Sequence, residues 1–224
     1  GSGSMVDRTI DDAHGEALLI AHKYMQFLLK SNVEALIKII KTDERFGKTD
    51  LAKKTVIFEQ DTSPILIGGF PNLQNAVEEP YFGILAAAND QHAGHYFTDI
   101  IDSYGLPSDS CRNSSIVCGV AIDDQLPYYG ACLITSNAPC DSSVMNSSVV
   151  ERRLKVPSIQ GCTPMRWKDE DTREYAIAHV KEVIQFIEDC TGETFDWDAF
   201  MKTVRQYNEE TRIQHELWEL AKSP

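Results

Sequence analysis

Two cysteines, Cys111 and Cys140, stand at positions where the sequence predicts that a loop gives way to a helix. A thiol at such a junction is exposed on one side and lies in the positive field of the helix N–H groups, which favours its thiolate form. Two thiolates that the fold brings together provide part of a soft-metal or iron–sulfur site. The pattern therefore predicts metal chemistry centred on Cys111 and Cys140.

The chain contains four further cysteines and no secretion signal, so all six are expected to be reduced thiols. No Cys-x-x-Cys pair is present, which argues against a zinc ribbon or a thioredoxin-type motif. Cys162 follows a predicted strand and has two interpretations, a third metal ligand or a half-buried structural thiol. We interpret Cys118, Cys132 and Cys190 as buried structural residues.

Short apolar segments alternate with amphipathic helices along the chain, which predicts an α/β fold. We expect a Rossmann-like three-layer domain with a mainly parallel sheet, preceded by an N-terminal helical segment. Functional groups gather at the carboxyl ends of parallel strands, where Cys140 and Cys162 are placed by this pattern. The predicted strands lie within residues 53–60, 64–69, 131–135 and 156–160. The predicted helices cover residues 16–29, a segment from 31, and residues 112–120, 141–154, 171–191 and 196 onward. Residues 81–104 are predicted to form one helix or two short ones broken around Gly94.

The predicted domain organisation has four parts. Residues 1–4 look like a remnant of an expression vector, residues 5–50 form the N-terminal helical segment, residues 51–195 form an α/β cluster-binding domain, and residues 196–224 form a C-terminal helix that leads to a missing second domain. No apolar run reaches the roughly 18 residues that span a bilayer, so we expect a soluble, cytoplasmic protein without a membrane partner. The net charge of −13 argues against binding to nucleic acid.

The segment 101–208 resembles the N-terminal part of the 2-hydroxyacyl-CoA dehydratase subunits, a family shared with the benzoyl-CoA reductase subunits. Residues 104–111 (YGLPSDSC) are similar to the segment that leads to the first cluster cysteine of the family, and residues 137–141 (NAPCD) are similar to the segment around the second. The remaining similar segments are residues 156–159, 186–196 and 207–212. The ordered series is more specific than any of these short segments alone.

The resemblance implies a 4Fe–4S cluster, with Cys111 and Cys140 as two of its ligands. The third cysteine of the family has no counterpart that we can place, and Cys162 is the substitute that this chain offers. Glu78 or Glu79 corresponds either to the active-site glutamate of the family or to a solvated surface pair.

The resemblance also implies a reaction and its partners. An ATP-hydrolysing activator protein is expected to inject one electron, and the dehydratase is expected to eliminate water from an (R)-2-hydroxyacyl-CoA through a ketyl radical. The subunit is expected to work as a heterodimer with a second dehydratase subunit, and the isolated chain to be inactive, with its cluster absent or incomplete. The alternatives are a benzoyl-CoA reductase-type subunit that reduces an aromatic acyl-CoA, and a non-catalytic electron-transfer or assembly partner.

Overall fold

A computed structural model describes residues 49–59, 64–77, 92–107, 109–126, 130–137, 141–162, 164 and 169–220, together with scattered positions between 19 and 41. The chain divides into two compact units, Gly1–Ile39 and Ile40–Pro224. The described positions from 19 to 37 are helical, in agreement with the predicted N-terminal helical segment. The elements below belong to the second unit.

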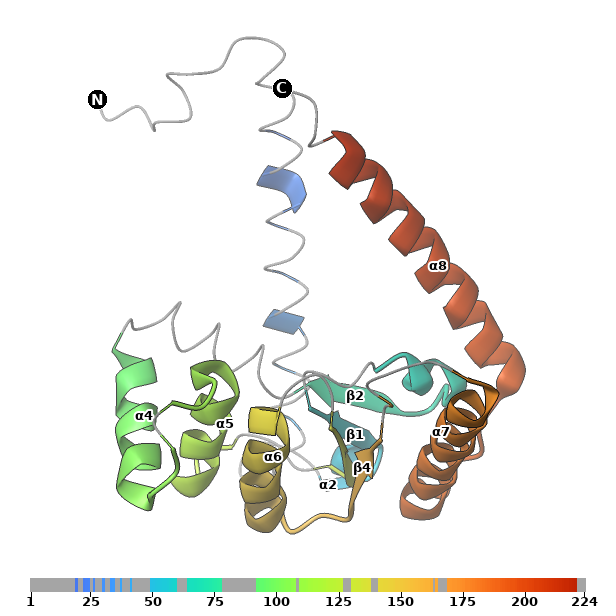
Figure 1. Ribbon diagram of the computed structural model, residues 1–224. Coiled ribbons are helices and arrows are strands. Elements are labelled where there is room, and N and C mark those ends of the chain that lie inside the picture. The colour runs from blue at the N-terminus through green and yellow to red at the C-terminus, as the bar shows by residue number, and fades with distance from the viewer. Residues whose placement is uncertain are drawn as a thin grey trace. The chain divides into compact units, whose positions relative to one another are not determined.

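Four parallel strands form the sheet in the order β2-β1-β3-β4 (Figure 1). The strands are β1 (Thr55–Phe58), β2 (Gln74–Val77), β3 (Cys132–Ser136) and β4 (Ser158–Gly161). The register places Ile57 opposite Leu133 and Ile134 opposite Ile159. Parallel neighbours need crossover connections, which here carry the helices. The all-parallel sheet confirms the predicted α/β class and is consistent with a Rossmann-like three-layer fold.

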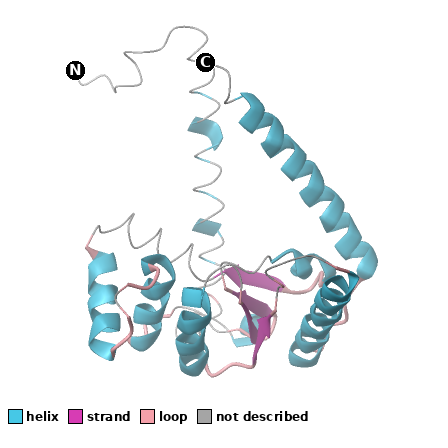
Figure 2. Ribbon diagram, in the orientation of Figure 1, coloured by secondary structure: helices cyan, strands magenta, loops and turns pink. Residues whose placement is uncertain are grey.

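Helices cover both faces of this sheet, with α4, α5 and α6 on one side and α7 on the other (Figure 2). The helices are α2 (Thr49–Ala52), the 3₁₀ helix η2 (Pro64–Gly69), α4 (Ala93–Tyr104), α5 (Arg112–Ile122), α6 (Asp141–Leu154), α7 (Glu170–Thr191) and α8 (Trp197–Leu220). Helix α6 has the predicted bounds, and α7 ends at Gly192, as the sequence predicts.

The two faces of the sheet have different partners because side chains alternate along a strand. One face packs against α7, η2 and the start of α8 in a core built from β1, β3 and α7. The members of this core include Val56, Phe58, Cys132, Ile134, Val183, Ile184, Ile187 and Phe195. The opposite face of β1 and β3 looks toward α5 and α6, and it becomes polar at its carboxyl end, where Glu59 and Thr135 lie. The polar carboxyl end is the part of the sheet that concerns function.

The predicted strand at residues 64–69 is wrong, because this segment forms η2. Its two glycines allow a close approach of the C-terminal part of the chain: a Cβ atom at Gly68 would collide with Thr203, and one at Gly69 with the ring of Phe195. The apolar side chains Leu66 and Ile67 pack against the core from a helical turn. The prediction also missed β2, which carries no apolar run and pairs with β1 at the edge of the sheet.

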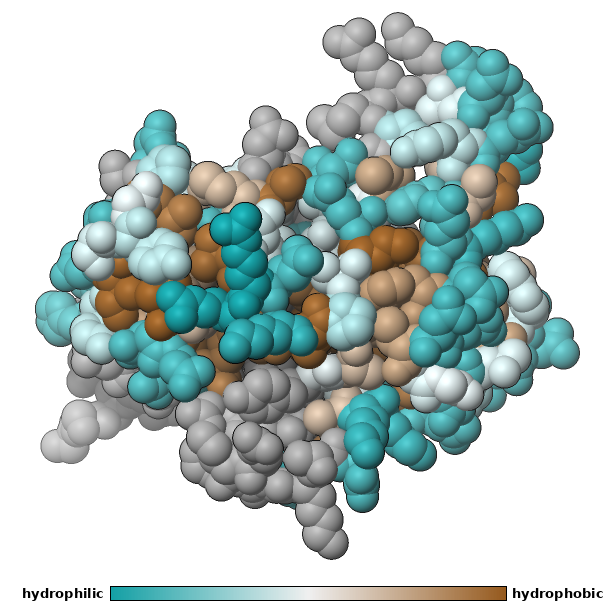
Figure 3. Space-filling model, turned by 90° about the horizontal axis from the view of Figure 1, so that it is seen from below, coloured by the Kyte–Doolittle hydropathy of each residue, from teal (hydrophilic) through white to brown (hydrophobic). Residues whose placement is uncertain are grey.

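The surface seen from below, on the side where α4 ends at Tyr104, carries mostly hydrophilic side chains with hydrophobic ones between them (Figure 3). Within the described ranges, every helix is too short or too polar to cross a membrane. The division of the chain into the four predicted parts stays a prediction.

Candidate functional site

The carboxyl ends of three neighbouring strands each lead directly to a polar or sulfur-bearing residue. Glu59 follows β1, Asn137 follows β3, and Cys162 follows β4. Backbone hydrogen bonds continue past the strands, from Glu59 N to Ile134 O at 3.0 Å and from Asn137 N to Gly161 O at 3.1 Å. These residues therefore share one edge of the sheet, which is where open parallel sheets bind their ligands.

Cys111 is the N-cap residue of α5 and is exposed, as the sequence predicts. Its carbonyl oxygen accepts hydrogen bonds from Ser115 N at 3.0 Å and from Ser115 Oγ at 2.7 Å. Ser115 is fully buried, and its hydroxyl also lies 2.8 Å from Ser110 Oγ. The backbone at Cys111 is thus held in place while its side chain stays accessible, which suits a thiolate ligand.

A second contact ties Cys111 to α6. Its amide donates a hydrogen bond to Ser142 Oγ at 3.1 Å, and Ser142 follows Cys140 by two positions in the sequence. Ser142 Oγ also accepts a hydrogen bond from Asn146 Nδ2 at 3.2 Å, and Asn146 is buried. Cys140 itself lies outside the described residues. The fold therefore joins the N-terminal ends of the two helices that the two cysteines precede.

Glu59 is the residue that the sequence interpretation missed. It is fully buried, and its carboxylate accepts a hydrogen bond from Ser143 Oγ in the first turn of α6. A buried carboxylate is costly unless it is hydrogen-bonded, and the positive N-terminal end of α6 adds a favourable field. The available signal was a carboxylate placed directly after an apolar strand. Glu78 and Glu79, the candidates that the sequence suggested instead, lie outside the described residues.

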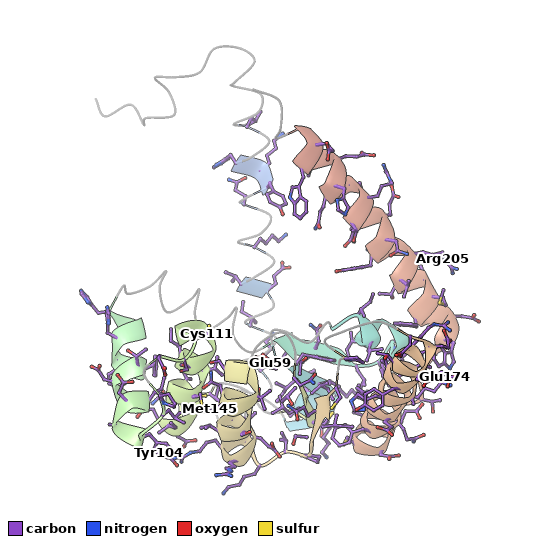
Figure 4. All side chains as sticks on the ribbon, viewed as in Figure 1. Glu59, Tyr104, Cys111, Met145, Glu174 and Arg205 are labelled. Atoms are coloured by element: carbon purple, nitrogen blue, oxygen red, sulfur yellow. The ribbon has the colours of Figure 1, made fainter. Side chains whose placement is uncertain are left out.

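In Figure 4, Cys111 at the start of α5 and Glu59 after β1 both lie toward the upper side of the sheet and its helices. Tyr104, at the C-terminal end of α4, lies toward the lower side. Ser142 and Ser143 are consecutive, so the first turn of α6 contacts both residues, Cys111 through one serine and Glu59 through the other. This turn of α6 is the centre of the candidate site.

Cys162 lies at the same edge of the sheet but has different neighbours. Its Sγ atom is 3.8 Å from Gln160 O. The same sulfur raises the pKa of the Tyr175 phenol on α7, first through the charge that it carries when ionised and second as a hydrogen-bond partner. The ring of His179 reaches the same Gln160 carbonyl through Nε2 at 3.0 Å and Glu182 through Nδ1 at 3.0 Å. Cys162 is half-buried, which agrees with either of its two interpretations.

The remaining cysteines have structural positions. Cys118 and Cys132 are fully buried, and Cys190 is half-buried, so the predicted burial is confirmed for the first two. Burial raises the pKa of the Cys132 thiol well above its ordinary value. The described cysteines form no disulfide with one another. Among the described residues, which do not include Cys140, no three His, Cys, Asp or Glu side chains form a group that could hold a metal ion.

Comparison with known families decides the identity of the chain. A family model described as 2-hydroxyglutaryl-CoA dehydratase, D-component, matches residues 82–224, which is more than half of the chain. The chain belongs to this family. The dehydratase match includes Cys111, Cys140 and Cys162, whereas Glu59 precedes it. No protein with curated annotation matches the chain significantly.

Proposed function

We propose that this chain is part of a dehydratase subunit that eliminates water from a 2-hydroxyacyl-CoA and holds a 4Fe–4S cluster through Cys111 and Cys140. The observation that carries the proposal is the hydrogen bond between the Cys111 amide and Ser142 Oγ, which links the two cysteine-bearing segments. The donor chemistry supports it, because an exposed thiol on a fixed backbone at a helix N-terminus suits iron–sulfur ligation. When bound, such a cluster supplies one-electron chemistry at low potential.

Cys162 is the third ligand that we propose from this chain. It follows β4, the strand that pairs with β3, and the segment after β3 leads to Cys140. Its half-exposed thiol is accessible, unlike the thiols of Cys118 and Cys132. Ligation by Cys162 can be tested separately from ligation by the other two cysteines.

Glu59 is proposed to handle the proton of the elimination. Removal of water from a 2-hydroxyacyl thioester breaks the C–O bond at position 2 and a C–H bond at position 3, and the proton and the hydroxyl group leave as water. A carboxylate at the same edge of the sheet as Cys162 provides a general acid or base for this transfer. Its hydrogen bond from Ser143 fixes the orientation of the carboxylate.

The family description names a component of a dehydratase, which supports dehydration over the reduction of an aromatic ring. The same word, component, supports a partner subunit. We further propose that an ATP-hydrolysing activator protein delivers the electron and that the protein works in the cytoplasm, in line with the resemblance described above.

The proposal is tested by anaerobic iron–sulfur reconstitution of the protein with its partner subunit. Iron and sulfide content and the visible absorption of the cluster are measured for the wild type and for Cys111→Ala, Cys140→Ala and Cys162→Ala, with Cys190→Ser as the matched control. We expect the first two variants to lose the cluster and the control to keep it. Equal iron content in the wild type and in the Cys111 and Cys140 variants would refute the cluster assignment. Unchanged iron content in Cys162→Ala would exclude Cys162 as a ligand and leave the assignment of the other two cysteines intact.

A separate measurement tests Glu59. The Glu59→Gln variant is expected to keep the iron content of the wild type and to lose turnover by roughly 10²–10⁴-fold in the activated complex, which is the usual contribution of a general acid or base. Full turnover by this variant would exclude Glu59 from proton transfer and leave the cluster assignment intact.

A further inference from the structure

A small polar cavity lies between α6 and the strands β3 and β4, on the face of the sheet that carries Glu59. Its volume is about 140 Å³. A single water molecule needs only about 10–15 Å³ of such space, so the cavity has room for a small organic molecule or for a segment of a larger one. The polar residues that line it are Thr135, Ser147, Ser148, Glu151, Ser158 and Gln160.

Ser147 is the residue in this lining whose hydroxyl group lacks a hydrogen-bond partner among the described residues. It is 5% exposed, and its hydroxyl is buried. Its neighbours on α6 are satisfied, because Ser148 Oγ donates to Val144 O at 2.9 Å and Ser143 Oγ donates to Glu59. Buried hydroxyl groups are normally paired, and an unpaired one on a residue that lines a polar cavity points to a bound group.

The charges of the lining restrict the chemistry of that group. Among the described residues of the lining, Glu151 is the one charged side chain, and its carboxylate only accepts hydrogen bonds. Since the residues described in this lining include no Lys or Arg, a phosphate or carboxylate ligand would meet a like charge and no counter-charge from them. A neutral ligand that offers a donor to the exposed Glu151 carboxylate therefore fits this lining better than an anion does.

The Ser147 hydroxyl adds the opposite requirement. A hydroxyl group has one hydrogen to donate and two lone pairs that accept, so full satisfaction needs a ligand that also accepts. An ammonium ion offers donors only and would leave the Ser147 hydrogen unpaired. A carboxamide or an alcohol meets both requirements.

We propose that this cavity binds a neutral group that both donates and accepts hydrogen bonds, a carboxamide or an alcohol. Ser147 lies one helical turn beyond Ser143, so the cavity adjoins the candidate site. Two sources share this chemistry. One is the pantetheine arm of an acyl-CoA, which carries two amides and a hydroxyl group and rests on the proposed function, and the other is a separate small polar molecule.

Binding is measured by saturation-transfer NMR on the 224-residue chain with acetamide, glycerol, pantetheine, methylammonium and phosphate as probes. We expect saturation transfer to the three neutral probes and none to methylammonium or phosphate. Tighter binding of pantetheine than of acetamide and glycerol assigns the cavity to the acyl-CoA, and equal or weaker binding assigns it to a separate small molecule. No transfer to any neutral probe, or transfer confined to the charged probes, would overturn the proposal.

The Ser147→Ala variant tests the residue that carries the argument. It removes no hydrogen bond among the described residues, so the unliganded variant should melt no lower than the wild type, while its affinity for the neutral probes should fall about fivefold or more. The matched control is Ser103→Ala, which removes an exposed hydroxyl on α4 that donates to Ile100 O and should leave binding unchanged. Unchanged affinity in Ser147→Ala would overturn the assignment. These readouts require neither iron nor turnover, so their failure is distinct from a failure of the dehydratase proposal.

Discussion

The amide of Cys111 donates a hydrogen bond to Ser142 Oγ at 3.1 Å, across 31 positions of sequence. Ser142 Oγ accepts a second hydrogen bond from the buried side chain of Asn146. The N-terminal end of α5 is thus held against the first turn of α6 by a hydroxyl group with a fixed orientation.

Replacement of Ser142 by alanine should expose the Cys111 amide to solvent exchange. The lost hydrogen bond is worth about 1 kcal/mol, which corresponds to roughly fivefold faster exchange. Hydrogen–deuterium exchange read at the Cys111 amide measures the effect. The control is Ser148→Ala on the same helix, whose hydroxyl bonds only within α6, to Val144 O. If the Cys111 amide exchanges at the same rate in both variants, the hydrogen bond to Ser142 does not protect this amide.

The cysteines should differ sharply in their reactivity toward iodoacetamide. Cys111 is exposed, whereas Cys132 is fully buried and burial raises the pKa of its thiol. Labelling of Cys132 requires local opening of the core, so Cys111 should react on the order of 100-fold faster or more. Mass spectrometry of the labelled peptides gives both rates from one sample. Similar rates for the two thiols would show that the core around β3 opens freely.

Replacement of Gly69 by alanine should destabilise the domain. A Cβ atom at this position would overlap the ring of Phe195, which packs between η2 and α8. Overpacking of this kind costs about 1–3 kcal/mol, read as a lower midpoint of urea unfolding. Gly94→Ala is the matched control, because its Cβ atom would make an ordinary van der Waals contact with Ile116 Cδ1 at 3.8 Å. Equal stability of the two variants would argue against the close approach of η2 and Phe195.

Asp169 should contribute to stability in a pH-dependent way. Its carboxylate caps α7 by accepting a hydrogen bond from Thr172 N at 2.9 Å, and the bonds from Thr172 lower the pKa of Asp169 below its ordinary value of 3.8. A group whose pKa is depressed by folding stabilises the fold above its unfolded pKa, and this contribution is lost as pH falls through the folded pKa. Asp169→Ala should therefore melt roughly 2–4 °C lower than the wild type at pH 7, with the difference shrinking below about pH 4. A difference that stays constant from pH 7 to pH 3 would contradict this account.

Much of the fold could be predicted from local signals. Helix α7 is bounded by the Asp169 cap and by Gly192, whose φ of +73° favours glycine, and both signals are visible in the sequence. The 3₁₀ helix at Pro64–Gly69 could not be distinguished from a strand, because its conformation depends on Thr203 and Phe195, which approach from more than 100 positions away. Strand β2 was missed because only pairing with β1 identifies it as a strand.

The candidate site was predictable to a similar extent. The exposed position of Cys111 before a helix follows from its local sequence, and the structure confirms it. Glu59 could not be found in the same way, since its partner Ser143 is 84 positions away and a single carboxylate after a strand has no distinctive pattern. The resemblance covers residues 101–208 and the family match covers residues 82–224, and Glu59 lies before both.

The paired hydrogen bonds of Ser142 and Ser143 also restrict how α6 can evolve. Successive side chains on a helix point about 100° apart. Two consecutive serines, one bonded to Cys111 at the start of α5 and the other to Glu59 after β1, therefore fix the angular phase of α6 about its own axis. Insertion of one residue ahead of Asn146 would turn the rest of the helix by that angle and break the bond from Asn146 to Ser142. Additional residues after Leu154, where α6 ends, leave that phase unchanged. Length variation in related chains should therefore be found at the C-terminal end of α6 and not in its first turn.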